Sequence, residues 1–86
     1  MSGMTFGDAL AALKHGAKVT REGWNGKGLW LELQVPDAHS KMTLPYIFLN
    51  YPVVLVENGR EPKRVPWFAS QTDMLGEDWQ IADSRA

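Results

Sequence analysis

The chain has 86 residues with four tryptophans, no cysteine and a formal net charge of −1. We expect a single domain over residues 1–86, with Met4 as an alternative natural start and residues 1–3 as a remnant of cloning. A general DNA- or RNA-binding protein would normally be basic, so no nucleic-acid partner is expected. The absence of cysteine excludes disulfides, thiolate zinc sites and cysteine nucleophiles. Without a membrane-length apolar run or a signal peptide, a soluble intracellular protein with no membrane partner is expected.

The number of tryptophans is large for a chain of this length. Small domains bury only about 60–65% of the surface that the unfolded chain exposes. Each tryptophan brings a large apolar area that a small core has difficulty covering. The composition therefore favours a homo-oligomer, or a ligand that covers aromatic surface.

Residues 5–15 follow the pattern of an amphipathic helix. Thr5 is the predicted N-cap, and Asp8 three residues later forms a capping box with it. Gly16 is the expected left-handed stop. The predicted buried stripe consists of apolar residues at the spacing i, i+3, i+4, i+7: Phe6, Ala9, Leu10 and Leu13.

Two strands are predicted next, at residues 18–21 and 28–35, with a glycine-rich turn between them that holds Trp24 at its tip. The second strand alternates between a leucine face, which we expect to pack on the helix, and a face that carries Trp30. A tryptophan on that second face leads us to expect that another subunit covers it.

The rest of the sheet is predicted from shorter signals. Residues 42–50 are mostly extended, and residues 53–57 are an apolar, β-branched strand followed by an Asn58-Gly59 turn. Residues 60–64 are expected to be a charged, solvated continuation. Residues 78–82 are the final short strand.

Between these strands, Ser70 is a good N-cap, and Asp73 three residues later makes Ser70–Asp73 close to a capping box. Gly76 is expected to end this helix within a few residues. The predicted fold is α+β: an N-terminal helix packed on an antiparallel sheet of about five strands, with a short helix before the last strand.

The residues offer little for catalysis. We expect both histidines, His15 and His39, at the surface, and they lack the paired spacing of a metal site. Asp73 is engaged in capping, and Glu77 and Asp78 are expected to be solvated. The glycine-rich turn lacks the strand–loop–helix context of a phosphate-binding loop. No catalytic residue, metal or cofactor is predicted.

For binding, the residues are more suitable. Tryptophan rings can stack on a flat heterocycle, and amide and hydroxyl side chains suit base edges and ribose hydroxyls. Arginine is preferred for a bidentate grip on phosphate. Two alternatives remain open: Trp67 and Trp79 can be core residues, and Ser70–Thr72 can be a plain cap and turn. The candidate groups are Trp24, Trp67 and Trp79 for stacking, Asn25, Ser70, Gln71 and Thr72 for hydrogen bonding, and Arg21, Lys27 and Arg64 for phosphates.

The spacing of these residues also resembles a known family. The segments Val19-x-Arg21-x-Gly-Trp-Asn-Gly26 and Val65-Pro-Trp-x-Ala-Ser-Gln-Thr-Asp73, followed by Leu75-x-Glu-Asp-Trp79, are similar to those of the second family of Thoeris anti-defence proteins, which are small phage proteins. The resemblance covers nearly the whole chain. It departs around residues 50–64, where this chain is predicted to have a longer, more apolar hairpin.

The resemblance implies a sponge that sequesters, without cleaving it, a cyclic ADP-ribose isomer (glycocyclic ADP-ribose) in the cytoplasm of the infected host. It also implies a homotetramer with pockets between subunits, and cyclic dinucleotides as candidate ligands of a separate site. Capture of the former would block a Thoeris effector, and capture of the latter would extend the block to CBASS. On this basis we place Trp24 with Phe6 or Trp79 against adenine, Asn25 and Thr72 at base or ribose, Asp73 at ribose hydroxyls and Arg21 at the pyrophosphate. The full predicted site is Phe6, Arg21, Trp24, Asn25, Trp67, Ser70, Thr72, Asp73 and Trp79.

Two other functions remain as alternatives. One is an enzyme that degrades the same messenger, and the other is a small accessory module that binds a host protein.

Overall fold

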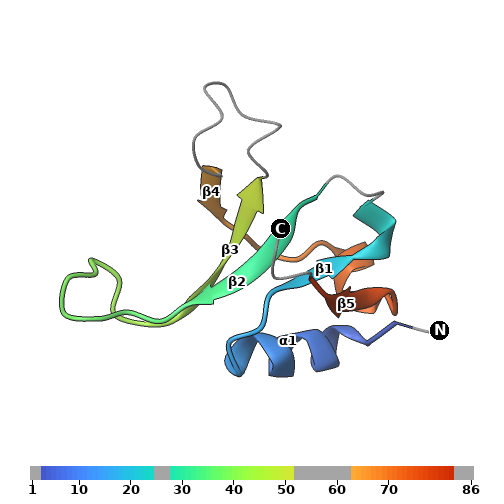
Figure 1. The fold of residues 1–86 in the computed structure, drawn as a ribbon, viewed down its shortest axis with the longest axis horizontal. Helices are drawn as coiled ribbons and strands as arrows, with labels where there is room; N and C mark the ends of the chain where they lie inside the picture. The colour runs from blue at the N-terminus through green and yellow to red at the C-terminus, as the bar shows by residue number, and fades with distance from the viewer. Residues whose placement is uncertain (1–2, 25–27, 52–62, 83–86) are drawn as a thin grey trace.

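The structure, a computed structural model, describes residues 3–24, 28–51 and 63–82. Its strands form a single antiparallel sheet in the order β4-β3-β2-β1-β5. This arrangement confirms the predicted α+β fold (Figure 1). The elements in chain order are α1 (Phe6–Lys14), β1 (Val19–Arg21), the 3₁₀ turn η1 (Glu22–Trp24), β2 (Trp30–Gln34), β3 (Tyr46–Tyr51), β4 (Lys63–Pro66), α2 (Gln71–Leu75) and β5 (Trp79–Ile81).

Helix α1 begins and ends where the local sequence predicts. The backbone N–H of Asp8 donates to Thr5 Oγ1 at 3.1 Å, and the N–H of Thr5 donates back to Asp8 Oδ2 at 3.1 Å. Gly16 has φ of 93°, a conformation that costs glycine little because it has no Cβ. The helix lies over β1, β2 and β5 (Figure 1). The core between helix and sheet consists of Ala9, Leu13, Val19, Leu31 and Trp79.

Strand β1 lies between β2 and β5 and brings the two ends of the chain together. In its register with β5, Arg21 is opposite Trp79. Met4 adds an isolated bridge on the other side of Trp79, through the Met4 N–H and the Trp79 carbonyl at 2.7 Å. Residues from the first and last thirds of the chain therefore meet at one corner of the sheet.

Strand β2 has the predicted alternation. Leu31 is fully buried in the core under α1, and Trp30 lies on the opposite face because successive strand residues point to opposite sides. Trp30 is nevertheless only 5% exposed, and its indole N–H donates to Glu32 Oε2 at 2.8 Å. Trp30 is therefore buried within a single chain. Its position on this face, from which a second subunit was predicted, does not require one.

Strand β4 corrects the prediction for residues 60–64. Lys63 and Arg64 are exposed, as predicted, but they form the start of a strand that pairs with β3. The four side chains of β4 are exposed, so the strand has no alternation of apolar and polar burial by which to recognise it. Pro66 is tolerated because β4 lies at an edge of the sheet. The predicted strand at 53–57 and turn at 58–59 lie outside the described residues.

The connection between β2 and β3, residues 35–45, extends away from the helix-covered part of the sheet as an arm (Figure 1). Its apolar side chains include Val35 and Leu44, which are 63% and 74% exposed. In the part of the chain that the structure describes, no helix is both long and apolar enough to span a membrane.

Candidate functional site

Four of the predicted site residues, distant in sequence, form one group of packed rings, which we call the aromatic cluster: Phe6, Trp24, Trp67 and Trp79. Trp79 is at its centre. The ring centroids of Phe6 and Trp24 lie 5.5 Å from that of Trp79, and the Trp67 centroid lies 6.2 Å from it. Such tilted and edge-on arrangements are those that aromatic quadrupoles favour.

The members of the aromatic cluster differ in exposure. Trp79 is 0% exposed, and its indole N–H donates to the Asp73 carbonyl at 3.0 Å, so within one chain it has no ring face left for a ligand. Phe6, Trp24 and Trp67 are partly buried against the core and retain some surface. The cluster thus combines a sealed centre with three partly accessible rings.

Trp24 does not project from a turn tip as expected. Residues Glu22–Trp24 form a 3₁₀ turn, and the Trp24 ring meets Trp79 edge-on at an interplanar angle of 77°. The physical reason is that a large apolar ring gains by covering the neighbouring indole. The predicted neighbour Asn25 lies outside the described residues.

Beside the aromatic cluster, Arg21 joins two carboxylates in an arrangement that we call the carboxylate clamp: Arg21, Asp73 and Asp78. Arg21 Nε donates to Asp78 Oδ1 at 2.8 Å, and Arg21 Nη1 donates to Asp73 Oδ1 at 2.8 Å. Arg21 Nη2 donates more weakly to Asp78 Oδ2, at 3.4 Å. The Arg21 side chain is 15% exposed. The clamp therefore links β1 to α2 and to the residue that precedes β5.

The clamp changes the pKa of each member. The hydrogen bond from Arg21, ahead of all other influences, lowers the pKa of Asp78. Burial acts most strongly on Asp73 and would raise its pKa, but hydrogen bonds from Ser70 and Arg21 outweigh burial and hold the pKa below its usual value. The hydrogen bond with Asp78 raises the pKa of Arg21 against the opposing effect of burial. All three groups are therefore charged at neutral pH.

Asp78 is the clamp residue that the sequence prediction missed. It was expected to be solvated, yet it accepts hydrogen bonds from Arg21 and, at 2.7 Å, from the backbone N–H of Gly23. No sequence pattern links it to Arg21, which is 57 residues away. The acidic run Glu77-Asp78 before a tryptophan was the only available signal, and such a run is usually a solvated face.

The predicted polar groups Ser70 and Thr72 lie at the start of α2. The Ser70 hydroxyl accepts from the Asp73 N–H at 3.1 Å, and Asp73 Oδ2 accepts from the Ser70 N–H at 2.9 Å, which confirms the capping box. The hydroxyls of Ser70 and Thr72 are 3.0 Å apart, and both residues are exposed. Asp73 thus has both carboxylate oxygens engaged, whereas Ser70 and Thr72 remain at the surface.

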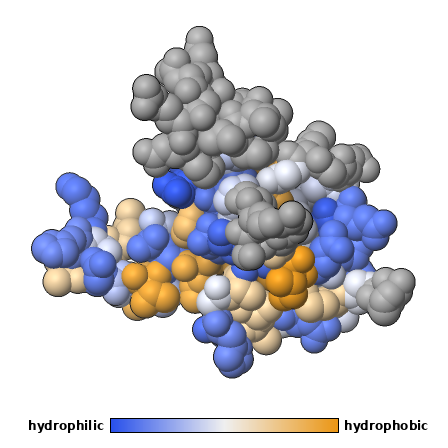
Figure 2. Space-filling model, in the orientation of Figure 1, coloured by the Kyte–Doolittle hydropathy of each residue, from blue (hydrophilic) through white to orange (hydrophobic). Residues whose placement is uncertain are grey.

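A groove lies on the other side of Trp67, where the arm joins the body. Its volume is about 690 Å³. Figure 2 shows hydrophobic residues gathered at this place. Because the groove is mostly apolar and open, it offers few directional contacts to a polar ligand. It is lined by Lys14, Leu33, Leu44, Pro45, Tyr46, Ile47 and Trp67.

The opposite face of the sheet carries a polar network that was not predicted. Asn50 is 0% exposed; its amide donates to Glu32 Oε2 at 3.1 Å and accepts from Arg64 Nε at 3.2 Å. Glu32 also accepts from the indole of Trp30. Arg64, one of the candidate phosphate groups, is therefore part of this network and not of the clamp.

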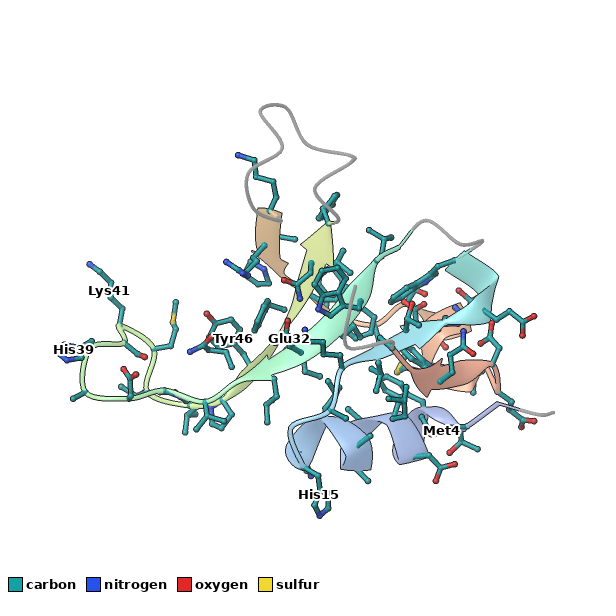
Figure 3. All side chains as sticks on the ribbon, viewed as in Figure 1. Met4, His15, Glu32, His39, Lys41 and Tyr46 are labelled. Carbon is teal, nitrogen blue, oxygen red and sulfur yellow. The ribbon has the colours of Figure 1, made fainter. Side chains whose placement is uncertain are left out.

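The two histidines are exposed, as predicted, and lie apart. His15 is at the C-terminal end of α1 and His39 is on the arm (Figure 3). Within residues 3–24, 28–51 and 63–82, no group of three or more His, Asp or Glu side chains is placed to hold a metal ion.

Comparison with known proteins relates this arrangement to one family. The family model described as Tad2-like, the Thoeris anti-defense 2-like domain, matches residues 4–82, which include every predicted site residue. A protein of Bacillus phage SP01 named Thoeris anti-defense 2 is 41% identical over 83 residues, which cover 91% of this chain and 93% of that relative. These similarities confirm the family resemblance seen in the sequence.

Proposed function

Because this chain belongs to the Thoeris anti-defense 2-like family, we propose that it counters Thoeris defence by binding and sequestering a cyclic ADP-ribose-type signal without cleaving it. The family match supports a phage protein that acts against Thoeris in the infected cell. We propose sequestration of glycocyclic ADP-ribose as the means. The observation that carries it is the meeting of partly exposed aromatic rings with surface hydroxyls and a charged clamp at one corner of the sheet.

The proposed site uses the accessible parts of this corner. Trp24 and Phe6 supply ring surface, with Trp79 packed behind them as support. Thr72 and Ser70 supply exposed hydroxyls for ribose or base edges. We retain the predicted set as the proposed site, whose members act by contact with the ligand or, as buried Trp79 does, by supporting the residues that make contact: Phe6, Arg21, Trp24, Asn25, Trp67, Ser70, Thr72, Asp73 and Trp79.

The energy required of such a site is moderate. A sponge must bind its ligand below the concentration that activates the effector, and nanomolar affinity corresponds to about −12 kcal/mol. Stacking contributes about 1–3 kcal/mol per base, and each charge-assisted hydrogen bond about 1.5–3 kcal/mol. A few such contacts reach this range when the site is preformed, because little binding energy is then lost in ordering it.

We also propose that the chain works as a homo-oligomer, with a tetramer favoured. Support comes from large apolar side chains left exposed in one chain: Phe68 is 89% exposed, and Leu75 and Leu44 are 77% and 74% exposed. Association would cover such surface and place additional groups beside each site. Cyclic dinucleotides remain the proposed second ligand class.

The test is to incubate the protein with glycocyclic ADP-ribose, remove free nucleotide, denature the protein by heat and identify the released molecule by mass spectrometry. Release of the intact nucleotide supports sequestration. Release of a product would identify an enzyme that degrades the messenger. Binding of neither this nucleotide nor a panel of cyclic dinucleotides would favour the protein-interaction module.

The site is tested with Trp24→Ala and Thr72→Ala. We expect Trp24→Ala to weaken binding by about tenfold or more, the scale of one lost stacking contact. His39→Ala is the control, because His39 is exposed on the arm and is not part of the aromatic cluster. Equal affinities of Trp24→Ala and the parent protein would exclude this site.

A further inference from the structure

We propose that Arg21 is a positioning residue, which holds the Trp24 turn and the start of α2 in register through the carboxylate clamp, and that it does not bind the ligand's phosphates. The inference rests on the proposed function for its binding readout. From the sequence, Arg21 was expected to bind the pyrophosphate; here it has a positioning role instead.

The net charge of the clamp disfavours a phosphate at Arg21. The clamp contains one guanidinium and two carboxylates, so its formal sum is −1. Both carboxylates have lowered pKa values and stay ionised at neutral pH. An anionic pyrophosphate approaching Arg21 would have to displace a carboxylate already bound at 2.8 Å, or accept its repulsion.

The surroundings of the Arg21 guanidinium leave little space for a ligand. A Cβ built on Gly23 would lie 2.8 Å from Asp78 Oδ2 and 3.2 Å from Arg21 Nη2. A Cβ on Gly76 would lie 3.0 Å from both Arg21 Nη2 and Asp78 Oδ1. The backbone of the 22–24 turn and that of the α2 C-terminus therefore close around the guanidinium, and the Trp79 ring lies 5.9 Å from Arg21 Cζ. A side chain at Gly23 would therefore displace Asp78, and one at Gly76 would press on the same clamp less strongly.

The clamp also connects two segments that carry proposed ligand-binding groups. Asp78 binds Arg21 and the N–H of Gly23, next to Trp24. Asp73 binds Arg21 and the N–H of Ser70, which caps α2. A single guanidinium thus connects two loops that are about 50 residues apart in sequence, and each loop carries proposed ligand-binding groups. A displacement of about 1 Å between such groups is enough to weaken recognition strongly.

Asp78→Asn distinguishes the two roles by the sign of its effect on affinity for glycocyclic ADP-ribose. If Arg21 bound phosphate, loss of a competing negative charge would raise the affinity. If Arg21 positions the loops, the affinity falls, because the amide of Asn has a single oxygen, which can accept from Arg21 Nε or from the Gly23 N–H but not from both. We expect a fall of about tenfold, the scale of one charge-assisted hydrogen bond. Asp37→Asn on the arm is the control: it removes the same charge, its amide oxygen can still accept the hydrogen bonds from His39 and Ser40, and it should leave the affinity unchanged.

Conservative replacement gives a second readout. Lysine binds phosphate well as a point charge but cannot bridge two carboxylates as a guanidinium does. A positioning role therefore predicts that Arg21→Lys binds nearly as weakly as Arg21→Met. Recovery of most of the affinity by Arg21→Lys would overturn the proposal. Affinities are compared at a temperature at which circular dichroism shows every variant to be folded.

Gly23→Ala tests the same claim without touching a charge. Its methyl group would push against Asp78 Oδ2 and open the clamp, so the affinity should fall with Arg21 intact. Gly7→Ala is the matched control, because its Cβ meets only Thr5 Oγ1 at an ordinary 3.7 Å. Unchanged affinity of Gly23→Ala would contradict the positioning role.

An NMR readout separates this inference from the proposed function. In Arg21→Met, the amide signals of Gly23 and Ser70 and the indole signal of Trp24 should all move, with or without ligand. Parent protein that binds no nucleotide would overturn the proposed function, whereas the NMR shifts would still support the clamp as the link between the loops. Unmoved Ser70 and Trp24 signals would overturn the positioning role even if the nucleotide binds.

Discussion

On the face of the sheet that α1 covers, Trp79 is enclosed by three other aromatic rings, whereas on the opposite face Trp30 is held by Glu32 within a polar network. Both tryptophans are buried, at 0% and 5% exposure. The stabilisation of Trp79 depends mainly on ring contacts and dispersion. The stabilisation of Trp30 depends mainly on hydrogen bonds, among them those of the fully buried Asn50.

This difference determines how each face responds to substitution. Loss of a ring from the aromatic cluster leaves a cavity, whose cost grows with its volume. Loss of a polar group from the network leaves its buried partners without a hydrogen bond. The loss in stability is then the desolvation penalty of those partners. In the described residues, every buried side-chain nitrogen or oxygen has a hydrogen-bond partner, so any polar deletion there disturbs a complete network.

The largest effect is expected from Trp79→Ala. Trp79 contacts all other members of the aromatic cluster and donates to the Asp73 carbonyl, so its loss should lower the free energy of unfolding by about 3–5 kcal/mol. Urea denaturation followed by circular dichroism measures this. His39→Ala, at an exposed residue of the arm, should change it by less than about 0.5 kcal/mol. Similar costs for the two variants would show that the cluster is not the centre of the core.

On the opposite face, Asn50→Leu should lower the free energy of unfolding by about 2–3 kcal/mol. Leucine has a similar volume but removes the donor to Glu32 and the acceptor for Arg64 Nε. The same denaturation experiment applies. Gln34→Leu is the control on this face, since within residues 3–24, 28–51 and 63–82 the Gln34 side chain makes only a 3.5 Å hydrogen bond to the Val35 carbonyl. If Asn50→Leu proved as stable as the parent, Trp30 would be held by packing and the contrast between the faces would disappear.

The carboxylate clamp predicts a dependence of stability on pH. The pKa values of Asp73 and Asp78 are lower in the folded chain than in the unfolded chain. Their contribution is therefore present above the unfolded pKa of about 4 and is lost as pH falls through the folded values. Asp78→Asn should cost about 1.5 kcal/mol at pH 7, and its deficit relative to the parent should vanish towards pH 2. Denaturation curves from pH 2 to 7 test this; a deficit independent of pH would rule out the ionised clamp.

The smallest effect is expected at the caps. Ser70→Ala removes the hydroxyl that accepts the Asp73 N–H, and Thr5→Ala removes the equivalent group of α1. Each should cost about 1 kcal/mol. Because α2 is short and carries Asp73 of the clamp, Ser70→Ala should also weaken nucleotide binding, whereas Thr5→Ala should not. Isothermal titration calorimetry of both variants measures their affinities. Equal affinities would show that the α2 cap does not contribute to the binding site.

Much of the fold followed from short-range rules. The caps of α1 and α2 were predicted because a hydroxyl and a carboxylate three residues apart satisfy backbone donors of the same segment. The two faces of β2 were predicted from the period of a strand. Strand β4 was missed because its edge position leaves its side chains exposed and its alternation absent.

The candidate site was only partly predictable, because its contacts join residues that are distant in sequence. Its residue types were identified, but the mutual contacts were not: Asp78 was expected in solvent, and Trp24 was expected at a turn tip.

The sequence by itself determined the interactions whose donors and acceptors lie within a turn or a strand period of one another. It also determined the family to which the chain belongs. What only the tertiary structure decided was that Arg21 meets Asp73 and Asp78, and that Phe6, Trp24 and Trp67 gather around Trp79. The physical reason is that these contacts join residues up to 73 positions apart. They arise only when β1 pairs with β5, and no local pattern encodes that register.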